Sequence, residues 1–387
     1  MNAVNLMPFF KLMAERQASD LFLSANSPIT IKIQGVCYPV NNQVLGPDHV
    51  KQLIYQILTP QRIARFEEDL ELNFGMALEG LGNLRINVFK SRGHVAMVAR
   101  FIKQKAATLE ELRVPTLLKD LVMEKRGIIL VVGATGSGKS STVSAMLDHR
   151  NENHPGHILT LEDPIEFLYT HKKSLVNQRE VGVDTHSYGD ALKNAMREAP
   201  DVLMIGEVRD RETMTYAIQY AQAGHLCITT LHANNSYHSL SRIVNFFPQE
   251  ARESLLYDMS TALRAIVSQR LVRNKAGKLV PAVEIMLNTP RIAELIRTGA
   301  LSDIKDAMEQ TLSEGSQTFE QALYRLYRSG EVELDEALRN ADSATNLSWM
   351  VNNAQSIEEQ EQQPAAAPTR QTSAPAPDNL DFDISLH

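Results

Sequence analysis

Four residues have the types and the spacing that bind a phosphate chain. Gly133, Gly138, Lys139 and Ser140 fit the pattern G-x-x-x-x-G-K-[S/T], between the apolar run IILVV and the helical sequence STVSAMLDH. In this context, glycines let backbone N–H groups curl around phosphates, and the helix adds the positive end of its dipole. Lys139 is predicted to reach the β- and γ-phosphates, and the Ser140 hydroxyl is predicted to bind Mg²⁺.

The alternative is a glycine-rich turn that matches this pattern by chance. It would require strand, helix and full motif to coincide, so we predict a site for a nucleoside triphosphate such as ATP. The residues expected to bind it form a phosphate-binding loop: Gly133, Ala134, Thr135, Gly136, Ser137, Gly138, Lys139, Ser140 and Ser141.

Glu207 is a candidate for activating water. It lies near the end of the apolar run VLMIGEV at residues 202–208. In a parallel sheet with a phosphate-binding loop, a carboxylate at the carboxyl end of a strand faces the γ-phosphate, where it can orient the attacking water. The alternative is that Glu207 pairs with Arg209 on a surface. We predict that Glu207 is catalytic.

The sequence LTLEDPIEF at residues 159–167 places three carboxylates, Glu162, Asp163 and Glu166, after another strand. Clustered carboxylates beside a triphosphate usually serve Mg²⁺ and its waters, because hard cations prefer oxygen ligands. The alternative is a turn capped by Asp163 next to Pro164. We favour Glu166 and Glu162 as site residues over Asp163.

Two histidines border the apolar run in AGHLCITTLHANNS (223–236). His232 ends a strand that follows the strand of Glu207, so we predict that its imidazole donates to a phosphate oxygen. A structural role is the alternative for His232, and we favour that role for His225. Histidines predicted to lie in surface loops are His154, His157, His171 and His186.

Arginines of the N-terminal region could add positive charge to this site. Arg85, Arg92 and Arg100 lie on or between predicted strands, and Arg85 and Arg100 could project near one another. By sequence alone a solvated strand face is the better interpretation. An arginine from a neighbouring element can nevertheless stabilise charge on a γ-phosphate.

The elements that must position these residues suggest two domains. Residues 1–103 read as a small α/β domain: a short amphipathic helix, the alternating strand ITIKIQG, a helical stretch at 47–69 divided at Pro60, and three strands, LNFGMAL, NLRINVF and HVAMVARF. Residues 104–120 read as a linker and hinge. From 121 to 350, the strands IILVV, ILTLED, VLMIGEV and LCITTLH alternate with helices, which predicts a parallel α/β sheet. Residues 250–340 read as mostly helical.

Composition and charge limit the class of protein. The net charge is −7, but residues 358–387 carry six acids against one base, so the rest is nearly neutral and nucleic acid is not expected as a partner. The Pro/Ala-rich tail at 351–387 is expected to be disordered. Two isolated cysteines fit a reducing cytosol. The sequence predicts no transmembrane segment and no signal peptide.

The order of motifs resembles that of the secretion-superfamily ATPases. GATGSGKS, LEDPIEF, GEVRD and TLHANN correspond to their Walker A motif, Asp box, Walker B motif and His box. Within this superfamily the chain resembles the type IV pilus retraction ATPases of the PilT/PilU group, on ASDLFLSANSPITIKIQG, LRINVFKSRGHVAMVAR and RIAELIRTG. ITTLHANNSYHSLSRIVNFFP, EAPDVLMIGEVRD and the tail are most similar to the accessory paralogue of that group.

The resemblance implies a PAS-like N-terminal domain and a RecA-like ATPase domain, in a homohexamer with nucleotide at the subunit interfaces. It assigns Glu207 as the catalytic glutamate, Glu166 as the Asp-box acid and His232 as the γ-phosphate sensor, and it brings Arg85 and Arg100 to the triphosphate. It also implies a cytoplasmic protein, peripheral at the inner membrane at the base of the pilus machine. The implied partners are a PilT-type retraction ATPase and an inner-membrane platform protein.

Three other functions remain open at this point. The chain could be a docking subunit of the primary retraction ATPase with dispensable hydrolysis, in which case the tail, ending in LDFDISLH, is a docking segment or only a solubilising one. It could be a pilus assembly or type II secretion ATPase, which the missing tetracysteine motif disfavours. A small-molecule kinase is less favoured still, because no acceptor-binding lid is evident.

Overall fold

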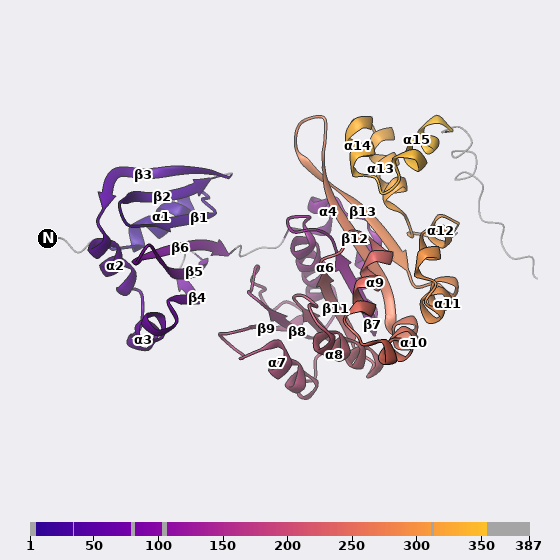
Figure 1. The fold of residues 1–387 in the computed structure, drawn as a ribbon, viewed down its shortest axis with the longest axis horizontal. Coiled ribbons are helices and arrows are strands. Elements are labelled where there is room, and N and C mark those ends of the chain that lie inside the picture. Colours follow the sequence, from indigo (N-terminus) through magenta and orange to yellow (C-terminus); the bar gives the residue numbers. More distant parts are fainter. Residues whose placement is uncertain (1–4, 34, 79–81, 103–106, 311–312, 354–387) are drawn as a thin grey trace, which may run out of the picture.

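The computed structural model describes residues 5–33, 35–78, 82–102, 107–310 and 313–353, which form two lobes with one β-sheet each (Figure 1). Most of the predicted tail, residues 354–387, and residues 104–106 of the predicted linker lie outside the described residues. The N-terminal lobe comprises residues 5–102 and the C-terminal lobe comprises residues 107–353.

The N-terminal lobe is an antiparallel sheet with three helices on one face. Its strand order is β3 (Val36–Leu45), β2 (Ser27–Ile33), β1 (Asp20–Leu23), β6 (His94–Ile102), β5 (Gly82–Ser91) and β4 (Glu71–Leu78). The helices are α1 (Met7–Glu15), α2 (Pro47–Tyr55) and α3 (Pro60–Asp69). Alternate residues of β5, namely Leu84, Ile86 and Val88, are fully buried in the core that these helices share.

Most of the predicted elements of this lobe are present. The helical stretch at 47–69 is divided into α2 and α3, since proline can begin a helix but cannot donate a backbone hydrogen bond within one. β1 and β3 were not predicted from the sequence. β1 has only four residues, and β3 is an edge strand whose residues are mostly exposed, so neither shows a clear apolar pattern.

The C-terminal lobe is a seven-stranded sheet in which only β13 is antiparallel. The order is β13 (Leu279–Leu287), β12 (Leu263–Arg273), β7 (Gly127–Val132), β11 (Leu226–Leu231), β10 (Val202–Ile205), β8 (Gly156–Glu162) and β9 (Ser174–Glu180). The helices are α4 (Leu109–Leu112), α5 (Leu117–Val122), α6 (Lys139–Asn153), α7 (Tyr188–Ala195), α8 (Arg211–Gln222), α9 (Ser236–Asn245), α10 (Arg252–Ala262), α11 (Pro290–Thr298), α12 (Ile304–Glu309), α13 (Phe319–Arg328), α14 (Leu334–Asn340) and α15 (Ala344–Asn352). Short 3₁₀ turns occur at Met196–Glu198, Gln249–Ala251 and Leu301–Asp303.

Helices cover both faces of this sheet, which explains why the parallel strands read as continuous apolar runs. All six residues of β7 are buried. Ile128 and Leu130 pack in a core with residues of α7 to α11, whereas Ile129 and Val131 pack in a second core with residues of α4 to α6. Strands β7, β8, β10 and β11 confirm the four predicted strands.

The prediction that residues 250–340 are mostly helical was wrong for the β12–β13 hairpin. Its strands bury polar residues, among them Ser268, Gln269 and Glu284, which interrupt the apolar pattern that a strand usually shows. Helices α13 to α15 pack against the outer end of this hairpin through Val272 and Val280 (Figure 1).

The two cysteines lie in contrasting places. Cys37 is exposed on β3, whereas Cys227 is fully buried in β11, where burial raises the pKa of its thiol to about 12. No described helix combines the length and the apolar composition that crossing a membrane requires.

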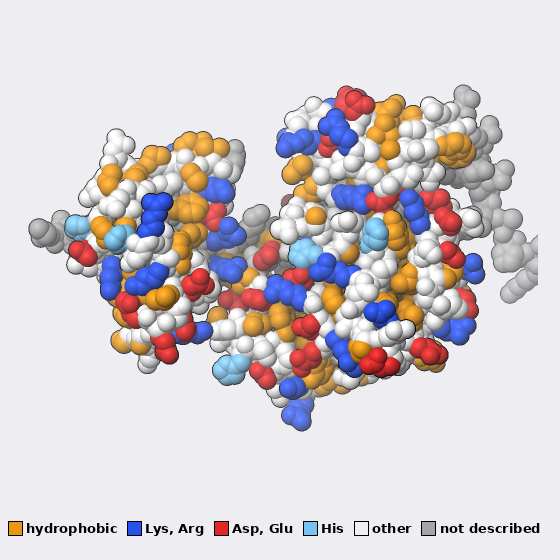
Figure 2. Space-filling model, viewed as in Figure 1, with side chains coloured by type: hydrophobic (Ala, Val, Ile, Leu, Met, Phe, Trp, Pro, Cys, Tyr) orange, Lys and Arg blue, Asp and Glu red, His pale blue; other side chains and the backbone are white. Residues whose placement is uncertain are grey.

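Opposite charges face each other where the lobes approach. Figure 2 shows Lys and Arg side chains along the edge of the N-terminal lobe that faces the C-terminal lobe, with Asp and Glu side chains opposite. Arg85 of β5 acts electrostatically on Glu180 of β9 and opposes the rise that burial causes in the pKa of that carboxyl. The facing edges of the two lobes therefore carry opposite charge in this arrangement.

Candidate active site

The phosphate-binding loop joins the central strand β7 to α6. Gly133 and Gly138 have φ values of +155° and +91°, a region that side-chain-bearing residues rarely adopt. A Cβ atom on Gly133 would lie 2.5 Å from the backbone oxygen of Gln269, and one on Gly138 would lie 2.6 Å from the Gln269 Nε2 atom. The two glycines therefore let the loop pass close to β12.

Lys139 begins α6 with its ammonium group folded over the loop. Its Nζ atom donates to the carbonyl oxygens of Gly133, at 2.8 Å, and Ala134, at 2.9 Å. Burial lowers the pKa of Lys139, and the carboxylates of Glu207 and Glu166 oppose that shift. No carboxylate among the described residues forms an ion pair with Lys139, so this cation has no direct anionic partner in that part of the chain.

The loop also contains a buried hydroxyl group that needs a ligand. The Oγ atom of Ser137 is buried and has no hydrogen-bond partner among the described residues. An unpartnered donor beside a cation that lacks an anion fits a phosphate chain, whose oxygens accept from both. The residues present therefore suit a nucleoside triphosphate.

A cavity of about 570 Å³ opens beside the loop, and it is lined by residues from four sequence motifs. The carboxyl ends of β7, β11, β10 and β8 meet there because these neighbouring strands are parallel. Its polar lining includes Lys139, Ser140, Ser141, Glu162, Asp163, Glu166, Glu207, Arg209, Thr230 and His232.

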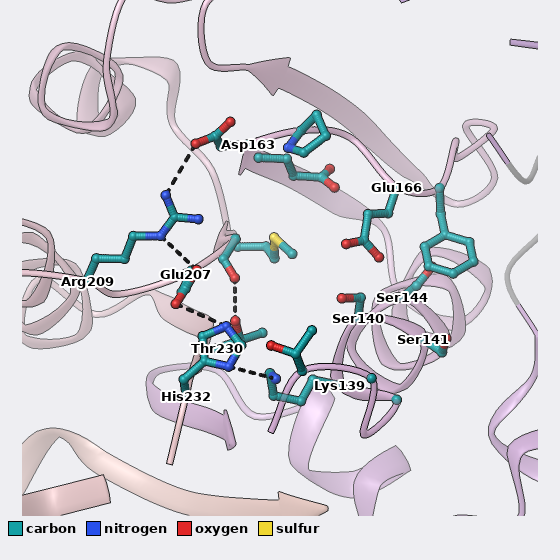
Figure 3. Close-up of a pocket in the computed structure, with 18 of the residues that line it drawn as sticks. Lys139, Ser140, Ser141, Ser144, Asp163, Glu166, Glu207, Arg209, Thr230 and His232 are labelled. Carbon is teal, nitrogen blue, oxygen red and sulfur yellow. Dashed lines mark hydrogen bonds and ion pairs between the residues drawn. The ribbon is translucent and has the colours of Figure 1, made fainter. Parts of the chain in front are cut away.

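Five side chains form a continuous line of contacts in strand order (Figure 3). Lys139 Nζ lies 3.4 Å from His232 Nδ1, and His232 Nε2 lies 3.4 Å from Glu207 Oε1. Arg209 Nε donates to Glu207 Oε2 at 2.8 Å, and Arg209 Nη1 lies 3.5 Å from Asp163 Oδ2. We call these five residues the polar row.

His232 links the cation of the phosphate-binding loop to Glu207. A neutral imidazole with its proton on Nε2 can accept from Lys139 at Nδ1 while its N–H group lies 3.4 Å from Glu207, so a single tautomer suits both contacts. Thr230, two residues earlier, donates to the carbonyl of Gly206 at 2.6 Å and fixes the adjoining strand ends together.

Of the two interpretations of Glu207, the pair with Arg209 is present, whereas the catalytic role stays a prediction. Glu207 does pair with Arg209, but the pair lines the cavity rather than an outer surface. The Glu207 side chain is 17% exposed, and the hydrogen bond that Arg209 donates to Glu207 raises the pKa of Arg209. Glu207 therefore lies between His232 and Arg209, open to the cavity.

The predicted acidic residues after β8 divide by environment. Glu162 is buried, accepts from Thr160 Oγ1 at 2.7 Å and from Gln178 Nε2 at 3.0 Å, and has a pKa raised by that burial. Glu166 is exposed on the cavity lining, and Asp163 joins the polar row. Binding of Mg²⁺ or its waters by these carboxylates stays a prediction. No cluster of metal-ligating side chains occurs among the described residues.

The other predicted residues lie away from the cavity. His225 precedes β11, at the opposite end of that strand from His232, and its ring contacts Tyr220. Arg85 and Arg100 face each other across β5 and β6, but neither lines the cavity of this chain. Arg100 instead donates to the buried Asp20 at 2.7 Å, so a role of either arginine at the triphosphate stays a prediction.

Sequence reasoning named Arg209 only as a possible surface partner of Glu207. Its position two residues after Glu207 was a usable signal, because both residues lie in the short loop that follows β10 and can line the same cavity. Gln269 was missed altogether. It accepts from Thr142 Oγ1 at 2.7 Å and thereby supports the first turn of α6 from β12.

A phosphate-binding loop after a central parallel strand, with a glutamate and a histidine after the next two strands, defines a P-loop nucleoside triphosphatase with two lobes. The sequence profile of the Type II/IV secretion system protein family matches residues 10–375, and the chain belongs to that family.

Relatives in this family cover most of the chain. It is 46% identical over 342 residues to the type IV pilus ATPase PilU of Pseudomonas aeruginosa, covering 88% of this chain and 90% of that protein. It is 39% identical over 334 residues to the type IV pilus retraction ATPase PilT of the same organism, covering 86% and 97%. The crystal structure of the pilus retraction motor PilT with bound ADP matches with a TM-score of 0.84 and 37% identity, covering 90% and 100%. The predicted fold class is thereby confirmed.

Proposed function

We propose that this chain is an ATP-hydrolysing motor of type IV pilus retraction, and that it acts as the accessory ATPase beside a PilT-type retraction ATPase. Its similarity to PilU and PilT over most of both lengths supports this assignment. The observation that carries it is the polar row, which brings a lysine, a histidine and a glutamate together at one cavity.

In this proposal the phosphate-binding loop first captures the triphosphate. The ammonium of Lys139 exchanges its contacts with the Gly133 and Ala134 carbonyls for phosphate oxygens, and the hydroxyl of Ser137 gains an acceptor. Bound Mg²⁺ would neutralise charge on the phosphates, held by the Ser140 hydroxyl and, through water, by Glu166.

Hydrolysis then depends on positioning within the polar row. Glu207 orients a water and accepts its proton as the oxygen attacks the γ-phosphorus, and the bond to the β-phosphate oxygen breaks, leaving ADP and phosphate. His232 lies beside Glu207 and Lys139, so it can contact the γ-phosphate and respond to its loss. Glu162 accepts hydrogen bonds from Thr160 and Gln178, and these contacts fix the start of the loop that follows β8.

Assembly and location belong to the same proposal. Six copies form a ring with nucleotide between subunits, and Arg85 and Arg100 supply charge to the triphosphate. Of the predicted linker at 104–120, only the part before α4 serves as a hinge, because Leu109 of α4 and Leu118 of α5 are buried in the core of the C-terminal lobe. The ring works in the cytoplasm at the inner membrane, where it acts on a platform protein that returns pilin to the membrane. The similarity to a pilus retraction motor supports this arrangement.

Cells that lack this gene test the proposal directly. Surface piliation and pilus retraction are measured after complementation with wild type or Glu207→Ala. We expect excess pili and weak retraction in the deletion strain, restored by wild type only. Rescue by Glu207→Ala would make the chain a docking subunit whose own hydrolysis is dispensable. Loss of pili in the deletion strain would make it an assembly motor.

A further inference from the structure

Arg209 lies between two carboxylates of the cavity that come from different strand ends. Its Nε atom contacts Glu207 at 2.8 Å on the β10 side, and its Nη1 atom lies 3.5 Å from Asp163 on the β8 side (Figure 3). The guanidinium group therefore bridges the loop that carries Glu207 and the loop that carries Asp163.

The backbone that carries Arg209 is fixed on both sides. Val208 donates its N–H to the carbonyl of Thr230 at 2.9 Å, which ties the loop to β11. Asp210 caps α8 by accepting from the Thr213 N–H at 2.8 Å. The side chain of Arg209 thus starts from a rigid point, and its orientation is set by the two carboxylates that it contacts.

The balance of charges in the cavity favours this bridge. Among the described lining residues, only Lys139 and Arg209 carry full positive charge. Four carboxylates line the same cavity: Glu162, Asp163, Glu166 and Glu207. Without Arg209, Glu207 would face Asp163 and an incoming triphosphate with no counter-ion on its outer side. The Arg209 side chain is 56% exposed and Glu207 17% exposed, so the guanidinium holds the carboxylate from the open side of the cavity.

We propose that Arg209 is a positioning residue that holds the carboxylate of Glu207 in its working orientation and links it to the Asp163 loop. The inference rests on the proposed ATPase function. A planar guanidinium can make both contacts from one fixed fork, which a lysine ammonium cannot reproduce. Arg209 acts through Glu207, so its loss should affect turnover rather than nucleotide binding.

The test is a double-mutant cycle on the full chain. ATP hydrolysis and the affinity for a fluorescent ATP analogue are measured for wild type, Arg209→Gln, Arg209→Lys, Glu207→Gln and the double variant Glu207→Gln/Arg209→Gln. We expect Arg209→Gln to lower kcat by about 10-fold to 100-fold, the range for a misplaced catalytic group, with affinity within about threefold of wild type. Arg209→Lys should fall between. In the Glu207→Gln background, Arg209→Gln should change kcat by less than about twofold.

The outcomes separate the alternatives. Weakened analogue binding with an unchanged kcat would make Arg209 a phosphate ligand, and equal losses of kcat in both backgrounds would make it independent of Glu207; either overturns the proposal. Arg65→Gln is the matched control, since Arg65 makes an exposed pair with Asp69 on α3. Melting temperatures identify a variant that fails to fold, in which case Arg209→Lys carries the cycle. An inactive wild type would refute the proposed function itself, whereas an active wild type with an unaffected Arg209→Gln refutes only the role of Arg209.

Discussion

Two replacements of Glu284 should show whether this buried side chain stabilises the fold as a hydrogen-bond acceptor or as a charge. Its side chain lies on β13, and its Oε1 atom accepts from the Ser236 N–H at 2.8 Å, the Ser236 hydroxyl at 2.6 Å and the Ser268 hydroxyl at 2.9 Å. Ser236 begins α9, four residues after His232, so Glu284 anchors the helix that follows His232 to the sheet.

Glu284→Ala should destabilise the C-terminal lobe by about 3–5 kcal/mol. Three buried donors lose their acceptor at roughly 1–3 kcal/mol each, reduced where the two hydroxyls rotate to other partners, and the truncated side chain leaves a cavity. For a lobe of this size, that corresponds to a fall in melting temperature on the order of 10 °C. Glu284→Gln keeps the acceptor oxygen and should stay within about 1 kcal/mol of wild type.

The pH dependence gives an independent check. Burial raises the pKa of Glu284 above its ordinary value of 4.5, so the folded chain keeps this proton when the unfolded chain has lost it. Its contribution to stability is therefore fully present below the unfolded pKa and is lost as pH rises through the folded pKa. Glu284→Gln should remove that part of the decline.

Calorimetric melting between pH 4 and pH 8 measures both effects. Glu333→Ala is the control, because that side chain is 68% exposed and should change stability by less than about 0.5 kcal/mol. The reasoning is refuted if Glu284→Ala melts within a few degrees of wild type, or if Glu284→Gln is as unstable as Glu284→Ala.

Three further predictions use simpler readouts. Lys139→Ala should lower affinity for a fluorescent ATP analogue by about 100-fold with little change in the melting temperature of the nucleotide-free chain, because its ammonium donates to two carbonyls of its own loop and contacts His232 only at 3.4 Å; retained affinity would contradict this. Gly138→Ala should cost about 1–3 kcal/mol in thermal melts, because the new Cβ meets Gln269 at a φ of +91°, and an unchanged melting temperature would refute the strain argument. Arg100→Gln should destabilise the N-terminal lobe by about 1 kcal/mol, because the buried Asp20 loses its cationic partner and keeps only the hydrogen bond from the Ser19 hydroxyl among those described, and adding Asp20→Asn should recover part of this loss.

The parallel strands were predictable because burial on both faces demands an unbroken apolar run. β7, β8, β10 and β11 all show such runs, and the residues after each strand were therefore recognisable as candidates. The order of strands was not predictable, since it depends on how crossovers pack. That order places His232 between Lys139 and Glu207, and Arg209 between Glu207 and Asp163.

The β12–β13 hairpin shows where local pattern fails. Glu284 and Ser268 are polar residues in buried strand positions, and each hydrogen-bonds to the other and to Ser236, which lies 32 residues or more away in sequence. Such partnerships exist only after folding. The same limit applies to Arg100, whose contact with Asp20 spans 80 residues.

The two thiols give the native chain a built-in chemical label and a built-in unfolding detector. Cys37 is exposed, so a maleimide should couple to it in folded protein. Cys227 is fully buried in β11 of the seven-stranded sheet, so a reagent cannot reach it in the folded chain. Burial also raises the pKa of its thiol to about 12, so almost no thiolate is present at neutral pH. One adduct per chain therefore marks an intact protein, and the rate at which a second adduct appears measures how often the sheet opens.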